Sequence, residues 1–338
     1  MSVIAGVCPL DTWRIRAFMG GVEFYGDLIA TVQPYPRRLV LSPRKLFLSL
    51  ALILSSVSVQ AGQSYPELDQ SVDARLQTQL EHKLEGLGLN DAVRKRHLSV
   101  ALADITDPER PRFATVNPDN MVYAASLPKI AILFGAFSRI EAGDMQLDTA
   151  TRDTLTRMIR VSSNSAATEM LNRVGMRYLA NQLQSPRVRL YDPKHNGGLW
   201  VGRPYGKGGE TMRDPMHNLS HGATALQVAR FYYLLETGRL VSPALTAEMK
   251  SILGNPGIHH KFVKGLEGER LAANIFRKSG SWRDFHADSA IVERDGRRYI
   301  AVALAEDPKG GEWLKHLIVG MDKAVFDTVP RSQVALLK

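Results

Sequence analysis

The residues most able to do chemistry begin at Ser126, which is followed three positions later by Lys129. A serine hydroxyl is a weak nucleophile at its own pKa and needs a base within hydrogen-bond reach. If a helix begins at Ser126, Lys129 lies one turn further along on the same face, and the helix N-terminus favours negative charge that develops there. The pattern predicts a Ser126 nucleophile with Lys129 as its base. The spacing alone is weak evidence, because Ser42 and Lys45 show it too.

A second polar motif, Ser162-Ser163-Asn164, lies between two apolar runs of helical period. A hydroxyl at such a junction can relay a proton, and an amide can hold a substrate carbonyl. The plainer alternative is a helix junction capped by Ser163 or Asn164. The motif therefore indicates Ser162 and Asn164 as candidates and does not distinguish chemistry from capping.

A third motif, Lys278-Ser279-Gly280-Ser281, falls in a strand-like run. Gly280 allows a substrate backbone to approach closely. The backbone N–H of Ser281 is a candidate donor to an oxyanion, with the N–H of Ser126 as the second donor. The alternative is an ordinary edge strand that carries a lysine. Each motif falls on the kind of element that its role requires, so the three together are more specific than any one.

The elements that must position these residues alternate in blocks along the chain. Helical periodicity predicts helices at 65–86, 127–140, 147–174 with an interruption at 162–164, 223–240, 243–253 and 312–329. Strand patterns occur at 97–106, 112–116, 274–281, 287–292 and 298–305. Residues 186–220 are rich in Gly, Pro, Asp and Asn and predict a long loop, which in a compact domain is usually functional. The order predicts one α/β domain that carries a helical insertion.

Composition excludes several classes of protein. Hydrophobic residues make up 44% and charged residues 23% of the 338 residues, which are ordinary globular values and exclude a disordered chain. Cys8 is the one cysteine, so a disulfide scaffold and a multi-cysteine metal site are excluded. The net charge of +9 comes from Lys and Arg scattered among acids, which does not favour nucleic-acid binding. We expect no metal and no organic cofactor.

The first 61 residues predict a leader. A basic stretch at 37–45 precedes an apolar run at 46–59 and then Ala61, the order of a secretory signal peptide with cleavage after Ala61. An uncleaved membrane anchor is the alternative, but the apolar run is short for a bilayer span. Because a signal peptide rarely begins so late, we also expect the true start near residues 39–40. The mature protein is then periplasmic or secreted, with no stable membrane anchor, and we expect a monomer.

The three motifs, in this order, resemble those of class A serine β-lactamases and, more broadly, of the penicillin-recognising serine hydrolases. The resemblance runs over nearly all of 62–338: SLPKIAILFGAFSRIEAG is similar to the family's nucleophile helix, SSNSAATEML to its Ser-Asp-Asn loop and RKSGSWRDFHADSAIV to its Lys-Thr-Gly strand. It implies an antiparallel sheet flanked by N- and C-terminal helices with an inserted all-α domain. The α/β domain would comprise 62–125 and 271–338, and the helical domain with the active-site loop 126–270.

The resemblance also assigns roles to the motif residues. Ser126 would be acylated with Lys129 as its base, and Ser162 would relay the proton. Asn164 would hold the substrate amide. Lys278 and Ser279 would bind the substrate carboxylate, and the backbone of Ser126 and Ser281 beside Gly280 would form the oxyanion hole.

Three departures from the family pattern bear on function. The stretch from Ser126 to Ser162 is shorter than usual in class A enzymes, which implies a more open cleft. The family's Glu-x-x-x-Asn loop motif is absent, and the nearest match begins at Asp192, which is either a deacylating base with too short a side chain or a structural residue. The stretch 197–210 has no family counterpart, and its Trp200 and Tyr205 either wall the cleft or pack on their own loop.

These departures leave three functions open. The first is a β-lactamase that acylates at Ser126 and then hydrolyses the acyl-enzyme, which overall similarity favours. The second is a peptidoglycan D,D-peptidase or another amide or ester hydrolase, which a trimmed cleft favours. The third is a penicillin-binding sensor that acylates without turnover, which loss of a deacylating base favours. The expected substrate is a β-lactam or a peptidoglycan-type compound.

Overall fold

The computed structural model describes residues 14–19, 22–27 and 65–327. The chain divides into two units, Met1–Gly62 and Gln63–Lys338. In the first unit, strands β1 (Arg14–Met19) and β2 (Val22–Asp27) pair antiparallel, a pairing that the sequence analysis did not predict. The predicted signal peptide and start site lie outside the described residues and stay predictions.

A five-stranded antiparallel sheet forms the centre of the second unit, in the order β10-β11-β12-β3-β4. Its strands are β3 (Leu98–Asp104), β4 (Arg112–Val116), β10 (Asn274–Trp282), β11 (Phe285–Arg294) and β12 (Arg297–Glu306). All five coincide with predicted strands. Because β12 pairs with β3, the sheet joins strands from the beginning and the end of the second unit. Strand β10, which carries the Lys-Ser-Gly motif, lies at one edge of the sheet.

Helices α2 (Ala74–Gly86), α10 (Phe262–Gly268) and α11 (Gly310–Asp327) pack with one face of the sheet in a hydrophobic core. Short helix α3 (Asn90–Arg94) follows α2. The predicted start of the first helix at residue 65 is wrong. Residues 68–70 form a 3-10 turn, Val72 bridges to Phe113, and the Asp73 carboxylate caps α2 by accepting from the Leu76 N–H at 2.8 Å. The pairing with β4 therefore overrides the helical period before Asp73.

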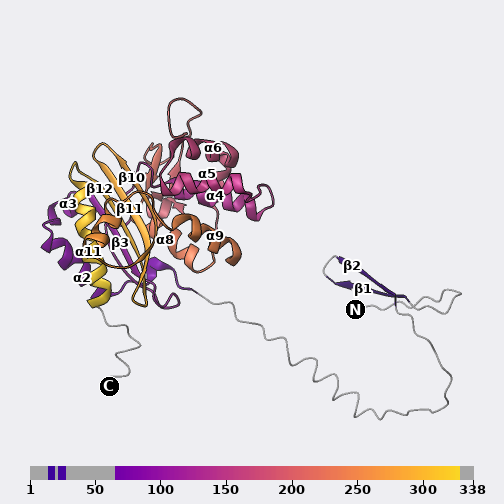
Figure 1. Ribbon diagram of the computed structural model, residues 1–338, viewed down its shortest axis with the longest axis horizontal. Helices are drawn as coiled ribbons and strands as arrows, with labels where there is room; N and C mark the ends of the chain where they lie inside the picture. Colours follow the sequence, from indigo (N-terminus) through magenta and orange to yellow (C-terminus); the bar gives the residue numbers. More distant parts are fainter. Residues whose placement is uncertain (1–13, 20–21, 28–64, 328–338) are drawn as a thin grey trace, which may run out of the picture. The chain divides into compact units, whose positions relative to one another are not determined.

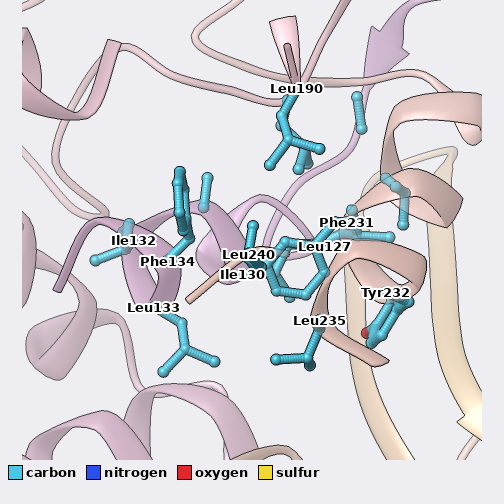
Figure 2. Close-up of a cluster of buried hydrophobic side chains, with 14 of the residues drawn as sticks. Leu127, Ile130, Ile132, Leu133, Phe134, Leu190, Phe231, Tyr232, Leu235 and Leu240 are labelled. Atoms are coloured by element: carbon cyan, nitrogen blue, oxygen red, sulfur yellow. The ribbon is translucent and has the colours of Figure 1, made fainter. Parts of the chain in front are cut away.

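The other face of the sheet is covered by α8 (Ala225–Glu236), which is buried nearly all round. A helix that is apolar on every side belongs between two layers. The second layer consists of α4 (Lys129–Glu141), α5 (Thr149–Arg160), α6 (Asn164–Val174), α7 (Met176–Gln184) and α9 (Pro243–Leu253). Figure 1 shows α2 and α11 on one side of the sheet and α8, α9 and α4 to α6 on the other. Figure 2 shows Leu127, just before α4, and Ile130 of α4 gathered with Phe231 of α8 and with Leu240 in one hydrophobic core.

The predicted loop at 186–220 contains short ladders. Strand β6 (Tyr191–Asp192) pairs with β7 (Gly197–Gly198), and a 3-10 turn at Pro193–His195 lies between them. Strands β5 (Val122–Tyr123), β9 (His221–Ala223) and β8 (Trp200–Val201) form a three-stranded sheet. This small sheet brings the long loop beside the residues that precede Ser126.

The predicted fold class is confirmed: an antiparallel sheet is flanked by the N- and C-terminal helices of the second unit, and the helical block is inserted between β5 and β10. The finer division at residues 125/126 and 270/271 stays a prediction. Among the described residues, no helix has both the length and the apolarity that a bilayer crossing requires.

The contact between α10 and α11 gives a test of the packing. A Cβ added at Gly265 would overlap the Lys315 carbonyl oxygen of α11 and lie 2.5 Å from Ile318, whereas a Cβ at Gly268 would meet no atom within 4 Å. We expect Gly265→Ala to lower the free energy of unfolding by about 1–3 kcal/mol, because α11 must shift. Gly268→Ala, the matched control, should not lower it. Urea unfolding of the two variants measures this, and equal stabilities would contradict the packing.

Candidate active site

Ser126 lies in a turn that leads into α4. Ala125, just before it, has a left-handed backbone with φ of 51°. The turn closes through a hydrogen bond from the Leu127 N–H to the Ala124 carbonyl at 3.0 Å, and the Ala124 N–H donates to the backbone carbonyl of His221 in β9 at 2.9 Å. Leu127 is fully buried while Ser126 stays half-buried. The local fold therefore anchors the turn on both sides and leaves the hydroxyl accessible.

Lys129 begins α4 and is completely buried. Its ammonium donates to the Ser162 carbonyl at 2.6 Å, to the Ser162 hydroxyl at 3.2 Å and to Asn164 Oδ1 at 2.8 Å. Burial lowers the pKa of Lys129 from 10.5 to about 7. A large fraction of Lys129 is thus neutral near pH 7, which is the state that a base requires.

The Ser162 hydroxyl lies between two lysines. Lys278 of β10, which is 2% exposed, donates to Ser162 Oγ at 3.0 Å and to the Ser279 carbonyl at 2.7 Å. A hydroxyl has two acceptor positions and one proton to donate. With both acceptor positions taken by Lys129 and Lys278, the proton of Ser162 is left to donate elsewhere, as a relay must. Burial, followed by the charge of Lys129, lowers the pKa of Lys278 well below its usual range.

Ser163 and Asn164 divide the two roles that the sequence left open. Ser163 is the N-cap of α6, and its hydroxyl accepts from the Ala166 N–H at 3.2 Å. Ser162 adopts a left-handed backbone with φ of 56°, and Asn164 begins α6 with its amide oxygen on Lys129. The motif is therefore both a helix cap and a set of site residues.

Gly280 brings the edge strand β10 against the turn that carries Ser126. A Cβ at this position would overlap the Ala124 carbonyl and lie 2.8 Å from the backbone nitrogens of Ser126 and Leu127. The glycine thus accommodates the protein's own backbone, in addition to the substrate approach predicted from the sequence. It sets the N–H of Ser126 beside the strand that carries Ser281.

The Ser281 N–H is free of the ladder. Trp282 and Phe285 close the two-residue turn between β10 and β11, and Ser281 lies opposite His286. In an antiparallel hairpin, bonded and non-bonded pairs alternate from the closing pair, which is bonded. The Ser281 N–H therefore points away from β11, and with the Ser126 N–H it can serve an oxyanion.

A cleft of about 600 Å³ opens at Ser126. Its lining includes Tyr123, Ser126, Asn164, Arg203, Tyr205, Lys207, His221, Ser281, Trp282, Arg283 and Phe285. Lys129, Ser162, Lys278 and the buried Ser279 lie behind this lining. The lining contains cationic and aromatic side chains and no carboxylate. In the described part of the chain, no group of three or more His, Cys, Asp or Glu side chains is placed to hold a metal ion.

Tyr205 and His221 complete the wall behind Lys129. The Tyr205 ring lies 4.6 Å from Lys129 Nζ and 4.2 Å from the His221 ring, and its hydroxyl donates to the Ala125 carbonyl at 3.3 Å. Burial lowers the pKa of His221 to about 4, so this ring is neutral near pH 7. From the sequence, Tyr205 is only a candidate wall residue, and His221 carries no signal, because a lone histidine after a loop forms no pattern.

Trp200 and Asp192 are not part of this arrangement. Trp200 is buried, packs on Tyr191 and donates to the Met212 carbonyl at 2.8 Å, so it serves the core. Asp192 caps the 3-10 turn that follows it, accepting from the Lys194 N–H at 2.9 Å, and it is not among the residues that line the cleft. The structure does not bring Asp192 to Ser126, and its assignment as the deacylating base stays a prediction.

The fold and the Ser-Lys-Ser-Lys constellation define the class of serine hydrolases that includes β-lactamases and penicillin-binding proteins. The sequence profile of the β-lactamase enzyme family matches residues 79–152 and 149–329, and the chain belongs to this family. No curated protein matches the chain. The predicted resemblance is thus confirmed at the level of the family.

Solved structures share the fold at low sequence identity. PBP-A is 18% identical with a TM-score of 0.57, over 79% of this chain and all of its own. A β-lactamase from Sphaerobacter thermophilus is 16% identical with a TM-score of 0.56, over 75% of this chain and 98% of its own. A class A β-lactamase from Bacteroides cellulosilyticus is 15% identical with a TM-score of 0.55, over the same shares. These similarities establish the fold and leave the activity to the site.

Gly280 gives a direct test of the site geometry. In Gly280→Ala the new methyl group must displace the nucleophile turn, and with it the Ser126 N–H. We expect covalent labelling by a penicillin to slow by about 10²-fold or more, the scale of one lost oxyanion donor, while circular dichroism stays that of the parent. Gly86→Ala on α2, where a Cβ would meet no atom within 4 Å, is the matched control. Labelling of Gly280→Ala at the parental rate would show that β10 does not constrain the turn.

Proposed function

We propose that the protein is a serine hydrolase that opens β-lactams by forming an acyl-enzyme at Ser126 and then hydrolyses that acyl-enzyme slowly. One observation carries the proposal: two buried lysines, Lys129 and Lys278, share the Ser162 hydroxyl behind an accessible serine. A variant of PBP-A, which shares the fold, has been solved as an acyl-enzyme complex with penicillin G.

Acylation follows from this arrangement. Neutral Lys129 takes the proton of Ser126 as Oγ attacks the carbonyl carbon, and the charge on the carbonyl oxygen is held by the N–H groups of Ser126 and Ser281. The C–N bond then breaks, and the nitrogen takes the proton of Ser162. Ser162 recovers a proton from Lys129, which returns to its neutral form. One proton has therefore left Ser126 and one has been gained by the leaving nitrogen, so the step balances.

Deacylation lacks an evident carboxylate. The residues that line the cleft include no Asp or Glu, and the pKa of Lys129 is shifted by burial without a paired acid. A water that attacks the ester must then be activated by a weaker or less well placed group. This observation favours slow turnover, and it also favours a second candidate function: a peptidase for peptidoglycan-type peptides that end in a free carboxylate, with that carboxylate near Lys278 and Ser279.

Intact-protein mass spectrometry after mixing with benzylpenicillin tests the proposal. We expect the mass to rise by one penicillin and to return only slowly, because acylation is supported and deacylation lacks a carboxylate. Ser126→Ala should show no adduct, since the hydroxyl makes the acyl bond. Absence of an adduct on the parent, or an adduct on Ser126→Ala, would refute the assignment.

Asp192→Asn, measured in the same experiment, decides the deacylating role. If Asp192 activates the water, this variant accumulates a long-lived adduct. Its capping contact supports parental rates for both steps instead, and that is the outcome we expect.

The pH dependence of acylation tests Lys129. The neutral amine is the active form, and its pKa is lowered to about 7. The acylation rate should therefore rise about tenfold per pH unit below 7 and level off above it. Lys129→Arg, always protonated, should be about 10²–10⁴-fold slower. Stopped-flow measurement from pH 5 to 9 shows this, and a midpoint near 4 would assign the proton to a carboxylate instead.

A further inference from the structure

The lining of the Ser126 cleft holds three cationic side chains and no carboxylate. Arg203 lies in the loop after β8, Lys207 lies four residues further on, and Arg283 lies in the turn between β10 and β11, all three on the cleft lining. Within the described part of the chain, these three side chains form no ion pair. Cations focused in a cleft attract an anionic ligand.

These cations are separate from the lysine expected to hold the terminal carboxylate. Lys278 is buried behind the lining, on Ser162 and Ser279, whereas Arg203 is half-buried and Arg283 exposed. Arginine matches a carboxylate with two parallel hydrogen bonds. Resting on the proposed function, we propose that the outer cleft binds a second carboxylate on the acyl donor, in addition to the one near Lys278. The substrate class is therefore a dianionic amide.

Benzylpenicillin and its α-carboxy derivative, carbenicillin, form a matched pair of probes for this subsite. They differ by one carboxylate on the side chain. For the parent we expect carbenicillin to acylate about five- to tenfold faster at low concentration, the scale of one charge-assisted contact near a surface. The preference should shrink as salt is raised to 1 M, because exposed charges are screened.

The variants Arg203→Gln and Arg283→Gln should each reduce the ratio of carbenicillin to benzylpenicillin rates, and the double variant should bring it near one. Arg94→Gln, an exposed arginine on α3, is the control for net charge and should keep the parental ratio. A parental ratio near one, or a ratio that the double variant leaves unchanged, overturns the subsite. Failure of both penicillins to acylate the parent would instead refute the proposed function, and the subsite with it.

A second observation, independent of the cleft rim, concerns Lys261. This residue is 5% exposed, and its backbone is held at φ 50° and ψ −115° before α10. Its ammonium donates to the Gly280 carbonyl at 2.5 Å, to Ser281 Oγ at 2.7 Å and to the Ala287 carbonyl at 3.1 Å. A non-glycine residue in such a strained conformation persists where the surroundings require it.

The bond to the Gly280 carbonyl matters because of the peptide unit to which it belongs. The carbonyl of Gly280 and the N–H of Ser281 are the two ends of one trans peptide and point in opposite directions. A cation at the oxygen withdraws electron density from the amide and makes its N–H a stronger donor. We infer that Lys261 is a positioning residue that polarises this peptide and so strengthens the Ser281 half of the oxyanion hole.

The charge state of Lys261 agrees with this role. Burial lowers the pKa of Lys261 to about 8, against the opposing effect of Asp288 on β11, while Arg277 on β10 adds to the lowering. Most of the side chain is therefore still an ammonium at pH 7. Lys278 follows Arg277 directly on β10.

Lys261→Met and Lys261→Gln remove the charge, and Lys261→Arg keeps it. We expect the neutral variants to acylate about 10- to 100-fold more slowly, less than the 10²–10³-fold loss of a whole donor, and Lys261→Arg to recover part of the rate. The loss should be equal for benzylpenicillin and its methyl ester. The ester carbonyl of the acyl-enzyme should shift to higher wavenumber in infrared difference spectra, since its hydrogen bond weakens.

Two outcomes would overturn the inference. A loss confined to the free acid would place Lys261 at the substrate carboxylate. In the neutral variants, a slower rate with an unshifted carbonyl band would mean a structural role. If Lys261→Met is shown by circular dichroism to be unfolded, the same two measurements on Lys261→Gln decide.

Discussion

The structure depends on one costly arrangement, the burial of two lysine side chains on a single serine hydroxyl. Lys129 comes from the helical block, Lys278 from the sheet and Ser162 from the junction between α5 and α6. Burying an ammonium without a counter-charge is expensive, and the protein lowers that expense by letting the groups lose protons. The reduced pKa of Lys129 is therefore a consequence of packing, and it is also the property that the proposed base role requires. In the proposed function, stability is given up at the place where catalysis needs it.

The framework around this arrangement serves to hold it. Arg277, next to Lys278, forms two hydrogen bonds with the fully buried Asp288 of β11, at 2.8 and 2.7 Å. This pair holds the edge strand to the sheet, and Asp288 balances the charge of Arg277. Lys261 adds positive charge that Asp288, already paired with Arg277, does not balance. A substrate that brings carboxylates into the cleft would supply the missing charge, so affinity for anionic acyl donors and tolerance of the buried cations have the same electrostatic origin.

Much of this could be predicted from the sequence, for identifiable reasons. The strands and helices that carry Ser126, Ser162 and Lys278 have clear periods, and their order in the chain predicts the sheet and its insertion. Lys261 could not be found, because its role depends on a contact across nineteen residues to Gly280 and on a backbone conformation that no period signals. Asp192 is indicated by its neighbours in sequence, which form a capped turn in the structure, and its deacylating role stays a prediction. The sequence therefore predicts the residues of each short motif, whereas it does not predict contacts between loops that are distant in the chain.

The carboxylate-free cleft bears on which substrate can be released. In the proposed mechanism, the groups that remain after acylation to activate a water are Lys129 and Ser162, on the side from which the leaving nitrogen would receive its proton. In a β-lactam the nitrogen stays tethered to the acyl group after the ring opens, and it stands where that water must enter. In a linear peptide the amine departs and the space fills with solvent. The same lysine can therefore serve both half-reactions of a peptide substrate and only the first half-reaction of a β-lactam. Under the proposed function, the arrangement would therefore give faster acylation than release of penicillins, without any loss of the groups assigned to catalysis.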